Sequence, residues 1–151
     1  MNPLLNQTPI YISVQRDNFA YDDHIKFYCT DGNCYTYHHE PDCCESVYID
    51  DIVGNFDKLL YHPILKADEK SSSYDYDDPS SNLTNIEDIE SATWTFYTFA
   101  GPKGYVDVRW IGESNGYYSE SVDLSVAPYT TSDLPTSTVE YLEQNFPEYL
   151  L

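Results

Sequence analysis

The chain has 151 residues, a length typical of one domain with a hydrophobic core of its own. Its 26 acidic residues outnumber seven Lys and Arg residues, which gives a net charge of −19. Such a surface repels phosphate backbones and anionic membranes, so we expect neither direct nucleic-acid binding nor membrane binding. Aromatic residues make up 16% of the chain, which excludes an intrinsically disordered protein.

The sequence also gives an expectation about location. It has no apolar run long enough to span a membrane, and its first residues lack the basic and apolar regions of a secretory signal. We therefore expect an intracellular protein, in a host cytoplasm or associated with a virion rather than secreted. In that setting the thiols are mostly reduced.

The first half of the chain is typical of short β-strands. A polar arm is expected over residues 1–9. Runs rich in β-branched and aromatic residues predict strands over 10–14, 24–29, 34–39, 46–49 and 64–67. A short helix is expected over 54–60, with Asn55 as its N-cap.

The Asp31-Gly32 pair predicts a two-residue hairpin between the second and third of these strands. Such a turn places Cys29 opposite Cys34, within about 4.5–5.5 Å between Cβ atoms and near disulfide reach. The alternative is a pair of small, partly buried thiols, which a reducing compartment favours.

Residues 68–90 form an acidic insertion with eight acids and one Lys, expected to be an exposed loop. Its acids include Asp75, Asp77 and Asp78, which lie beside tyrosines. The plain interpretation is a solvated loop. The sharper hypothesis is a surface that imitates a nucleic acid and contacts a basic partner.

The second half predicts a three-stranded meander over 92–99, 105–111 and 117–126. A linker then leads to a helix over 138–146. Val139, Leu142 and Phe146 fall on one stripe of that helix, which predicts docking on its own core or in a partner's groove.

These elements predict a mainly β fold of the α+β kind. It is an antiparallel, β-rich single domain of hairpins and a meander, with one short internal helix and one short C-terminal helix. The expected organisation is an N-terminal arm (1–9), a β-rich domain (10–127) with the acidic insertion (68–90), and a linker with the C-terminal helix (128–151).

One cluster of residues has the chemistry of a zinc or redox site: His38, His39, Cys43 and Cys44. The spacing speaks against zinc, because adjacent Cys side chains tend to diverge and strand alternation places the two histidines on opposite faces. The plainer alternative is a corner between strands with Glu45 at its rim. A Cys–His nucleophile is a third interpretation, but it lacks an evident orienting residue.

A second cluster predicts a pocket for an anionic or nucleotide-like ligand. Arg109 would clamp the anion, while Ser114 and Asn115 donate hydrogen bonds and Tyr117 or Trp94 stacks. Glu45 is the further candidate in this set. The plainer interpretation of Arg109 is a structural ion pair with Asp107, two residues away on the same strand face.

Two runs, residues 38–59 and residues 93–97 with 109–119, resemble a family of small phage and bacterial proteins. Its marks are a histidine-containing run into Cys-Cys-Glu-x-Val and a Ser-Asn-Gly-Tyr-Tyr-Ser turn. The similarity covers roughly residues 10–125 and implies a small single domain of viral or phage-related source. It carries no activity over, and it leaves out the acidic insertion, the C-terminal helix and the Cys29–Cys34 pair.

Both marked runs sit at strand ends or turns, so we expect them to converge, with Cys43, Cys44 and Glu45 meeting the Arg109–Tyr117 segment. The leading functional hypothesis is a non-enzymatic acidic binding protein. It would engage a protein with a basic surface or act as a subunit of a larger assembly. The alternatives are a small-molecule binder around Arg109 and a zinc- or redox-active site at the histidine–cysteine cluster.

Overall fold

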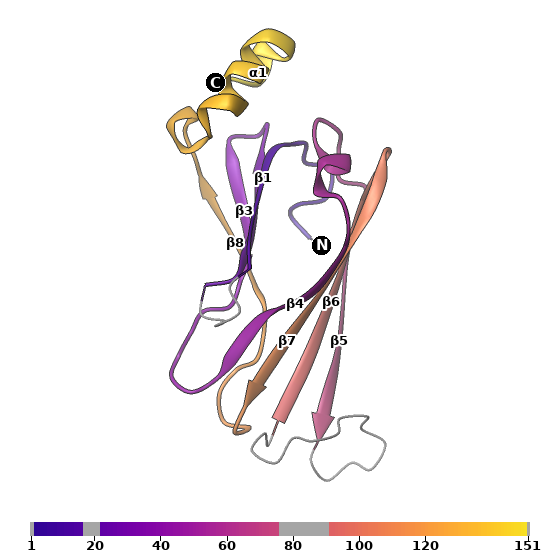
Figure 1. Cartoon of the computed structure of the whole chain (residues 1–151), viewed down its shortest axis with the longest axis vertical. Helices are drawn as coiled ribbons and strands as arrows, with labels where there is room; N and C mark the ends of the chain where they lie inside the picture. Colours follow the sequence, from indigo (N-terminus) through magenta and orange to yellow (C-terminus); the bar gives the residue numbers. More distant parts are fainter. Residues whose placement is uncertain (1, 17–21, 76–90, 151) are drawn as a thin grey trace.

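The computed structural model describes residues 2–16, 22–75 and 91–150 (Figure 1). In these ranges eight strands form two four-stranded antiparallel sheets. Sheet A has the order β1 (Pro9–Gln15), β2 (His24–Cys29), β3 (Asn33–His38) and β8 (Asp123–Pro128). Sheet B has the order β4 (Ser46–Gly54), β7 (Gly104–Ser114), β6 (Ser91–Gly101) and β5 (Lys66–Asp75). The predicted antiparallel, β-rich single domain is confirmed.

The two sheets pack face to face around an aromatic core. Strand alternation directs every second side chain inward. Phe27 of sheet A therefore meets Phe99 of sheet B with 5.0 Å between ring centroids, and Tyr37 meets Tyr97 at 4.9 Å. Trp110 of β7 is buried in the same core, 1% exposed. Each of these large rings buries a large apolar area between the two sheets.

The hairpin between β2 and β3 differs from the expected two-residue turn. Gly32 N–H donates to the Cys29 carbonyl, and Gly32 has a φ of 84°, which favours glycine. The turn therefore holds one more residue, and Cys34 pairs with Tyr28 instead of Cys29. The predicted placement of Cys29 opposite Cys34 is therefore wrong. The alternative, a pair of buried thiols, is confirmed, because both cysteines are free and buried.

The predicted three-stranded meander is also wrong. β6 and β7 form the expected hairpin, but β8 starts only at Asp123 and pairs with β3 in the other sheet. The free edge of β7 is taken by β4, a pairing between distant segments. Residues 115–122 thus form a crossing loop rather than a strand.

The acidic insertion begins as a strand, not as a loop. β5 continues to Asp75, which pairs with Ser91 of β6. An edge strand accepts charged side chains because one of its faces points to solvent. Asp77 and Asp78 lie outside the described residues, and the partner-binding hypothesis for them is untested.

The N-terminal arm packs on the sandwich rather than standing apart from it. Leu4 is fully buried in the main core, and the Asn2 side-chain amide donates to the Tyr37 hydroxyl at 2.9 Å. The predicted internal helix is a shorter 3₁₀ turn, Phe56–Leu59, which Asn55 caps as expected by accepting from the Asp57 N–H at 2.9 Å.

The C-terminal helix α1 (Thr136–Asn145) lies at one end of the molecule (Figure 1). Its predicted apolar stripe is docked on the domain itself: Leu142 is fully buried, and Val139 and Phe146 pack beside it. Of the two expected alternatives, docking on the chain's own core is the one observed, so the stripe is occupied here and is not open to a partner's groove. No helix in the described part of the chain is long and apolar enough to cross a membrane.

Phe146 also belongs to an aromatic cluster that covers the end of the sandwich. Tyr61 stacks on Phe146 with 5.0 Å between centroids and on Tyr141 at 5.4 Å, and Tyr149 stacks on Phe146 at 5.1 Å. We name these four residues the aromatic cluster.

Candidate functional site

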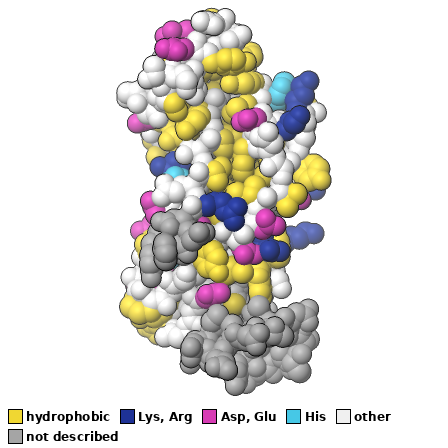
Figure 2. Space-filling model, viewed as in Figure 1, with side chains coloured by type: hydrophobic (Ala, Val, Ile, Leu, Met, Phe, Trp, Pro, Cys, Tyr) yellow, Lys and Arg dark blue, Asp and Glu magenta, His cyan; other side chains and the backbone are white. Residues whose placement is uncertain are grey.

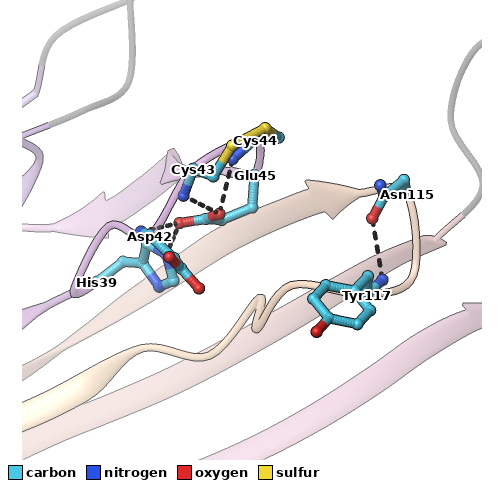
Figure 3. Close-up of a disulfide and its surroundings, with 7 residues drawn as sticks. All are labelled: His39, Asp42, Cys43, Cys44, Glu45, Asn115 and Tyr117. Carbon is cyan, nitrogen blue, oxygen red and sulfur yellow. Dashed lines mark hydrogen bonds and ion pairs between the residues drawn. A yellow bond between two sulfur atoms is a disulfide. The ribbon is translucent and has the colours of Figure 1, made fainter.

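The loop between β3 and β4 is built around a buried carboxylate, Glu45 (Figure 3). Glu45 is 5% exposed. Its Oε1 accepts from the Asp42 N–H at 2.6 Å and its Oε2 from the N–H groups of Cys43 and Cys44 at 3.1 Å each. Its fourth contact is His39 Nε2, 2.9 Å from Oε1. We name these five residues the Glu45 hub.

The donors of the hub stabilise the charged carboxylate. The Asp42 backbone N–H makes the largest contribution, followed by His39, and together with the other backbone donors they lower the pKa of Glu45 to about 2. Glu45 is thus an anion at every physiological pH, and it is engaged by donors rather than open to a ligand. The Glu45 carboxylate therefore serves to hold the β3–β4 loop in place.

His39 connects the hub to a second loop. Its Nδ1 lies 2.7 Å from the Ser121 carbonyl oxygen, while Nε2 faces the Glu45 carboxylate. The two ring nitrogens thus face acceptor oxygens from two different loops. The hub therefore ties the β3–β4 loop to the 115–122 loop.

Cys43 and Cys44 form a disulfide with each other, although adjacent side chains were expected to diverge. Both residues are exposed. Since their sulfurs are bonded together, they do not serve as thiolate ligands in this structure.

The other predicted zinc ligands do not gather around them. His38 Nε2 lies 3.3 Å from the Ser125 hydroxyl on the outer face of sheet A, whereas His39 turns to the hub. No group of three or more His, Cys, Asp or Glu among the described residues is placed to hold a metal ion. The predicted zinc set is thus not assembled here.

The Ser114–Tyr117 turn uses its polar groups internally. The Ser114 hydroxyl donates to Glu120 Oε2 at 2.5 Å and accepts from the Gly116 N–H at 2.9 Å. Asn115 Oδ1 accepts from the Tyr117 N–H at 3.0 Å, and the Tyr117 side chain is 84% exposed. Ser114 and Asn115 therefore shape the turn, while the exposed Tyr117 ring contacts Tyr118 with 5.1 Å between ring centroids.

Glu120 lies under this turn as a second buried carboxylate, 8% exposed. Its backbone presses on β7 at Gly112, where an added Cβ would lie 2.6 Å from the Glu120 carbonyl oxygen. Glu120 Oε1 has no hydrogen-bond partner in the described part of the protein. Burial, followed by the negative charge of Glu120, raises the pKa of Glu113.

The two sequence runs converge in part. Ser46 pairs with Glu113, so the hub and the Ser114 turn lie at the same end of sheet B (Figure 3). Arg109 lies five residues farther along β7, about 16 Å away for an extended strand. The expected single site that joins Arg109 to the cysteines is therefore not formed.

Arg109 makes a structural ion pair, but with Asp50 and not with Asp107. Its Nη2 and Nε both lie 2.6 Å from Asp50 Oδ2. An irregularity in the β4–β7 register lies between Ile49 and Asp51, which lets Asp50 reach this face. Asp107 accepts instead from the Thr98 hydroxyl at 2.6 Å.

A hollow of about 390 Å³ lies beside Arg109 on the outer face of sheet B. Asp51, Arg109, Phe96 and Lys70 form one row across the four strands. Phe96 is 40% exposed between the two cations. The other expected ligand contacts do not line the hollow: Trp94, Ser114, Asn115, Tyr117 and Glu45.

A hollow of about 460 Å³ on the outer face of sheet A was not predicted from the sequence. His24 pairs directly with His38 across β2 and β3. Two residues farther along, on the same face of the sheet, Lys26 pairs with Thr36. Burial is the largest cause that lowers the pKa of His24. The alternation of polar residues in both strands was the signal that could have revealed this hollow.

Taken together, the two sheets define a class: an antiparallel β-sandwich with polar loops at one end and a docked helix at the other. The chain belongs to the family described as a domain of unknown function (DUF7448), whose model matches residues 2–124. No curated protein and no solved structure matches the chain. The family match ends within β8, so α1 lies beyond it.

Proposed function

We propose that the protein is a non-enzymatic binding protein whose acidic surface engages a partner protein with a basic surface. One observation carries the proposal: after Arg109 the chain holds seven acidic residues and no Lys or Arg. Four of these acids are exposed around α1: Asp133, Glu140, Glu143 and Glu148.

The docking of α1 supports this choice of surface. Because Leu142 and its apolar neighbours are buried against the sandwich, the helix presents its polar side to a partner. Figure 2 shows acidic side chains at the α1 end and along the rest of the drawn face, with Lys and Arg side chains near its middle and at its upper right. The excess of acidic residues on and around α1 itself would steer a basic partner toward the helix and repel acidic ones.

Two narrower parts belong to the proposal. The first is a phage- or virus-related source, which rests on the resemblance of residues 38–59 and of 93–97 with 109–119 given above, and the second is a role as one subunit of a larger assembly. A partner in that setting would be a protein met inside an infected cell or a virion.

The test compares two variants that remove the same amount of charge. The α1 variant is E140Q/E143Q/E148Q, and the control is D22N/E40Q/D51N, whose three residues are also exposed. The probe is a folded basic protein, lysozyme, titrated at low and moderate salt. We expect binding to the α1 variant to weaken on the order of tenfold, with a smaller salt dependence, while the control stays within about twofold.

Two results would contradict the proposal. Equal weakening of both variants would mean that net charge alone attracts the probe. Unchanged binding by the α1 variant would mean that its acidic surface is not used.

The hollow on sheet B favours a second candidate function, the binding of a small anionic ligand with an apolar part. Phe96 supplies an apolar floor, and Lys70 supplies a cation for which no partner is seen among the described residues. The probe is 8-anilinonaphthalene-1-sulfonate, which carries both features. We expect K70Q to weaken its binding several-fold and K103Q, an exposed lysine in the β6–β7 turn, to leave it unchanged. If K70Q and K103Q bound the probe equally well, the hollow would be excluded as its binding site.

A further inference from the structure

The four cysteines fall into two classes that differ in access. Cys43 and Cys44 form an exposed disulfide, whereas Cys29 and Cys34 are buried thiols. Burial raises the pKa of both thiols, which disfavours their reactive thiolate forms. Any reagent in solution therefore meets the Cys43–Cys44 pair first.

The disulfide is directly connected to the Glu45 hub. It closes a small ring that contains the peptide bond between the two cysteines, and this fixes the direction of the Cys44 backbone N–H. The Cys43 N–H belongs to the preceding peptide and adjoins the ring at the Cys43 Cα. Those N–H groups of Cys43 and Cys44 donate to Glu45 Oε2 at 3.1 Å each. The disulfide thus holds the Cys44 donor within its ring, and the Cys43 donor lies directly beside the ring.

The Glu45 hub is connected to the neighbouring loop, residues 115–122, through His39. His39 bridges Glu45 and the Ser121 carbonyl, so a change in the position of Glu45 alters the support of residues 115–122. This loop carries Tyr117, which is 84% exposed, and Glu120, whose backbone contacts β7 at Gly112. An exposed loop that carries the buried carboxylate Glu120 is therefore linked to one disulfide.

We propose that Cys43–Cys44 is a reversible redox modification site that takes a dithiol reductant and controls the order of the Glu45 hub. A thiolate of the dithiol attacks one sulfur, which breaks the Cys43–Cys44 bond and forms a mixed disulfide. The second thiol of the reductant then displaces the other cysteine. Two electrons and two protons pass to the protein, which ends with two thiols, and the reductant ends as a disulfide.

The reduced state frees the peptide between the two cysteines to rotate. Its single N–H, that of Cys44, is then no longer held toward Glu45, and the β3–β4 loop and the 115–122 loop become more mobile. Exposure favours this chemistry, because exposed disulfides are the ones that exchange readily with dithiols. The inference uses a different end of the molecule from α1 and does not depend on the proposed partner.

The first test uses the full chain, purified without reductant. Iodoacetamide is added to the native protein before and after brief treatment with dithiothreitol, and the labelled residues are identified by peptide mass. We expect no label on Cys43 or Cys44 before reduction and label on both after it, while Cys29 and Cys34 react only in denaturant. Label on Cys43 or Cys44 before reduction, or a bond that persists through the treatment, would overturn the proposal.

The second test follows the hub by NMR of the native protein. Reduction is expected to shift the backbone amide signals of Asp42, Cys43, Cys44 and Ser121, and reoxidation to restore them. C29S/C34S keeps this response, and C43S/C44S shows none. Amide signals of the wild-type hub that stay in place after confirmed reduction would overturn its link to the disulfide, and this holds whether or not a variant folds.

Discussion

The two ends of the sandwich are held by opposite kinds of interaction (Figure 1). At one end the Glu45 hub joins loops through hydrogen bonds to a buried carboxylate. At the other end α1 is held by Leu142 and the aromatic cluster. Hydrogen bonds to a charged group depend on its protonation, whereas apolar contacts depend on volume and shape. The end with the Glu45 hub is thus suited to respond to changes in pH or redox state. The end with α1 is suited to keep its structure through such changes.

The largest expected effect is at the fixed end. Leu142→Ala removes a fully buried side chain, and the cavity should lower the free energy of unfolding by about 2–5 kcal/mol. Urea unfolding measures the change, and Gln144→Ala on the exposed side of α1 should change it by less than about 0.5 kcal/mol. Equal effects of the two substitutions would mean that α1 is not docked.

A smaller effect is expected where the crossing loop presses on β7. The Cβ of Gly112→Ala would lie 2.6 Å from the Glu120 carbonyl oxygen, so backbone must shift at a cost of about 1–3 kcal/mol. Gly101→Ala is the matched control, since its Cβ would meet the Pro63 carbonyl at 3.3 Å. A Gly112→Ala protein as stable as the control would contradict the observed loop position.

The pH dependence separates the two ends most clearly. Because folding lowers the pKa of Glu45 from 4.5 to about 2, the hub contributes stability that is present above pH 4.5 and lost as the pH falls toward 2. Glu45→Gln should remove that part of the pH dependence, whereas Leu142→Ala should keep it and lower stability at every pH. Urea unfolding between pH 2 and pH 6 measures all three proteins, and parallel curves for wild type and Glu45→Gln would refute the assignment.

Local patterns predicted the local structure well. The alternation of residues 24–29 and 105–111 located β2 and β7, and the stripe through Leu142 located the docked face of α1. Asn55 caps a turn as its side-chain chemistry suggests. These features depend on near neighbours in the sequence, which a single sequence displays.

Pairings between distant segments could not be predicted in the same way. Nothing in residues 46–54 indicates that β4 takes the free edge of β7, and this pairing sends β8 to the other sheet. The hub was missed because three donors to Glu45 are backbone N–H groups, which every non-proline residue carries. The Arg109–Asp50 pair depends on an irregular register that composition does not reveal.

Native-state hydrogen exchange, measured on oxidised and reduced protein, tests the contrast between the two ends most directly. Reduction should speed the exchange of the Asp42, Cys43 and Cys44 amides on the order of tenfold or more, because their hydrogen bonds to Glu45 are lost. The Phe146 amide, which donates to the Leu142 carbonyl in α1, should exchange at the same rate in both states. Equal acceleration at both ends, or none at the hub, would contradict the account.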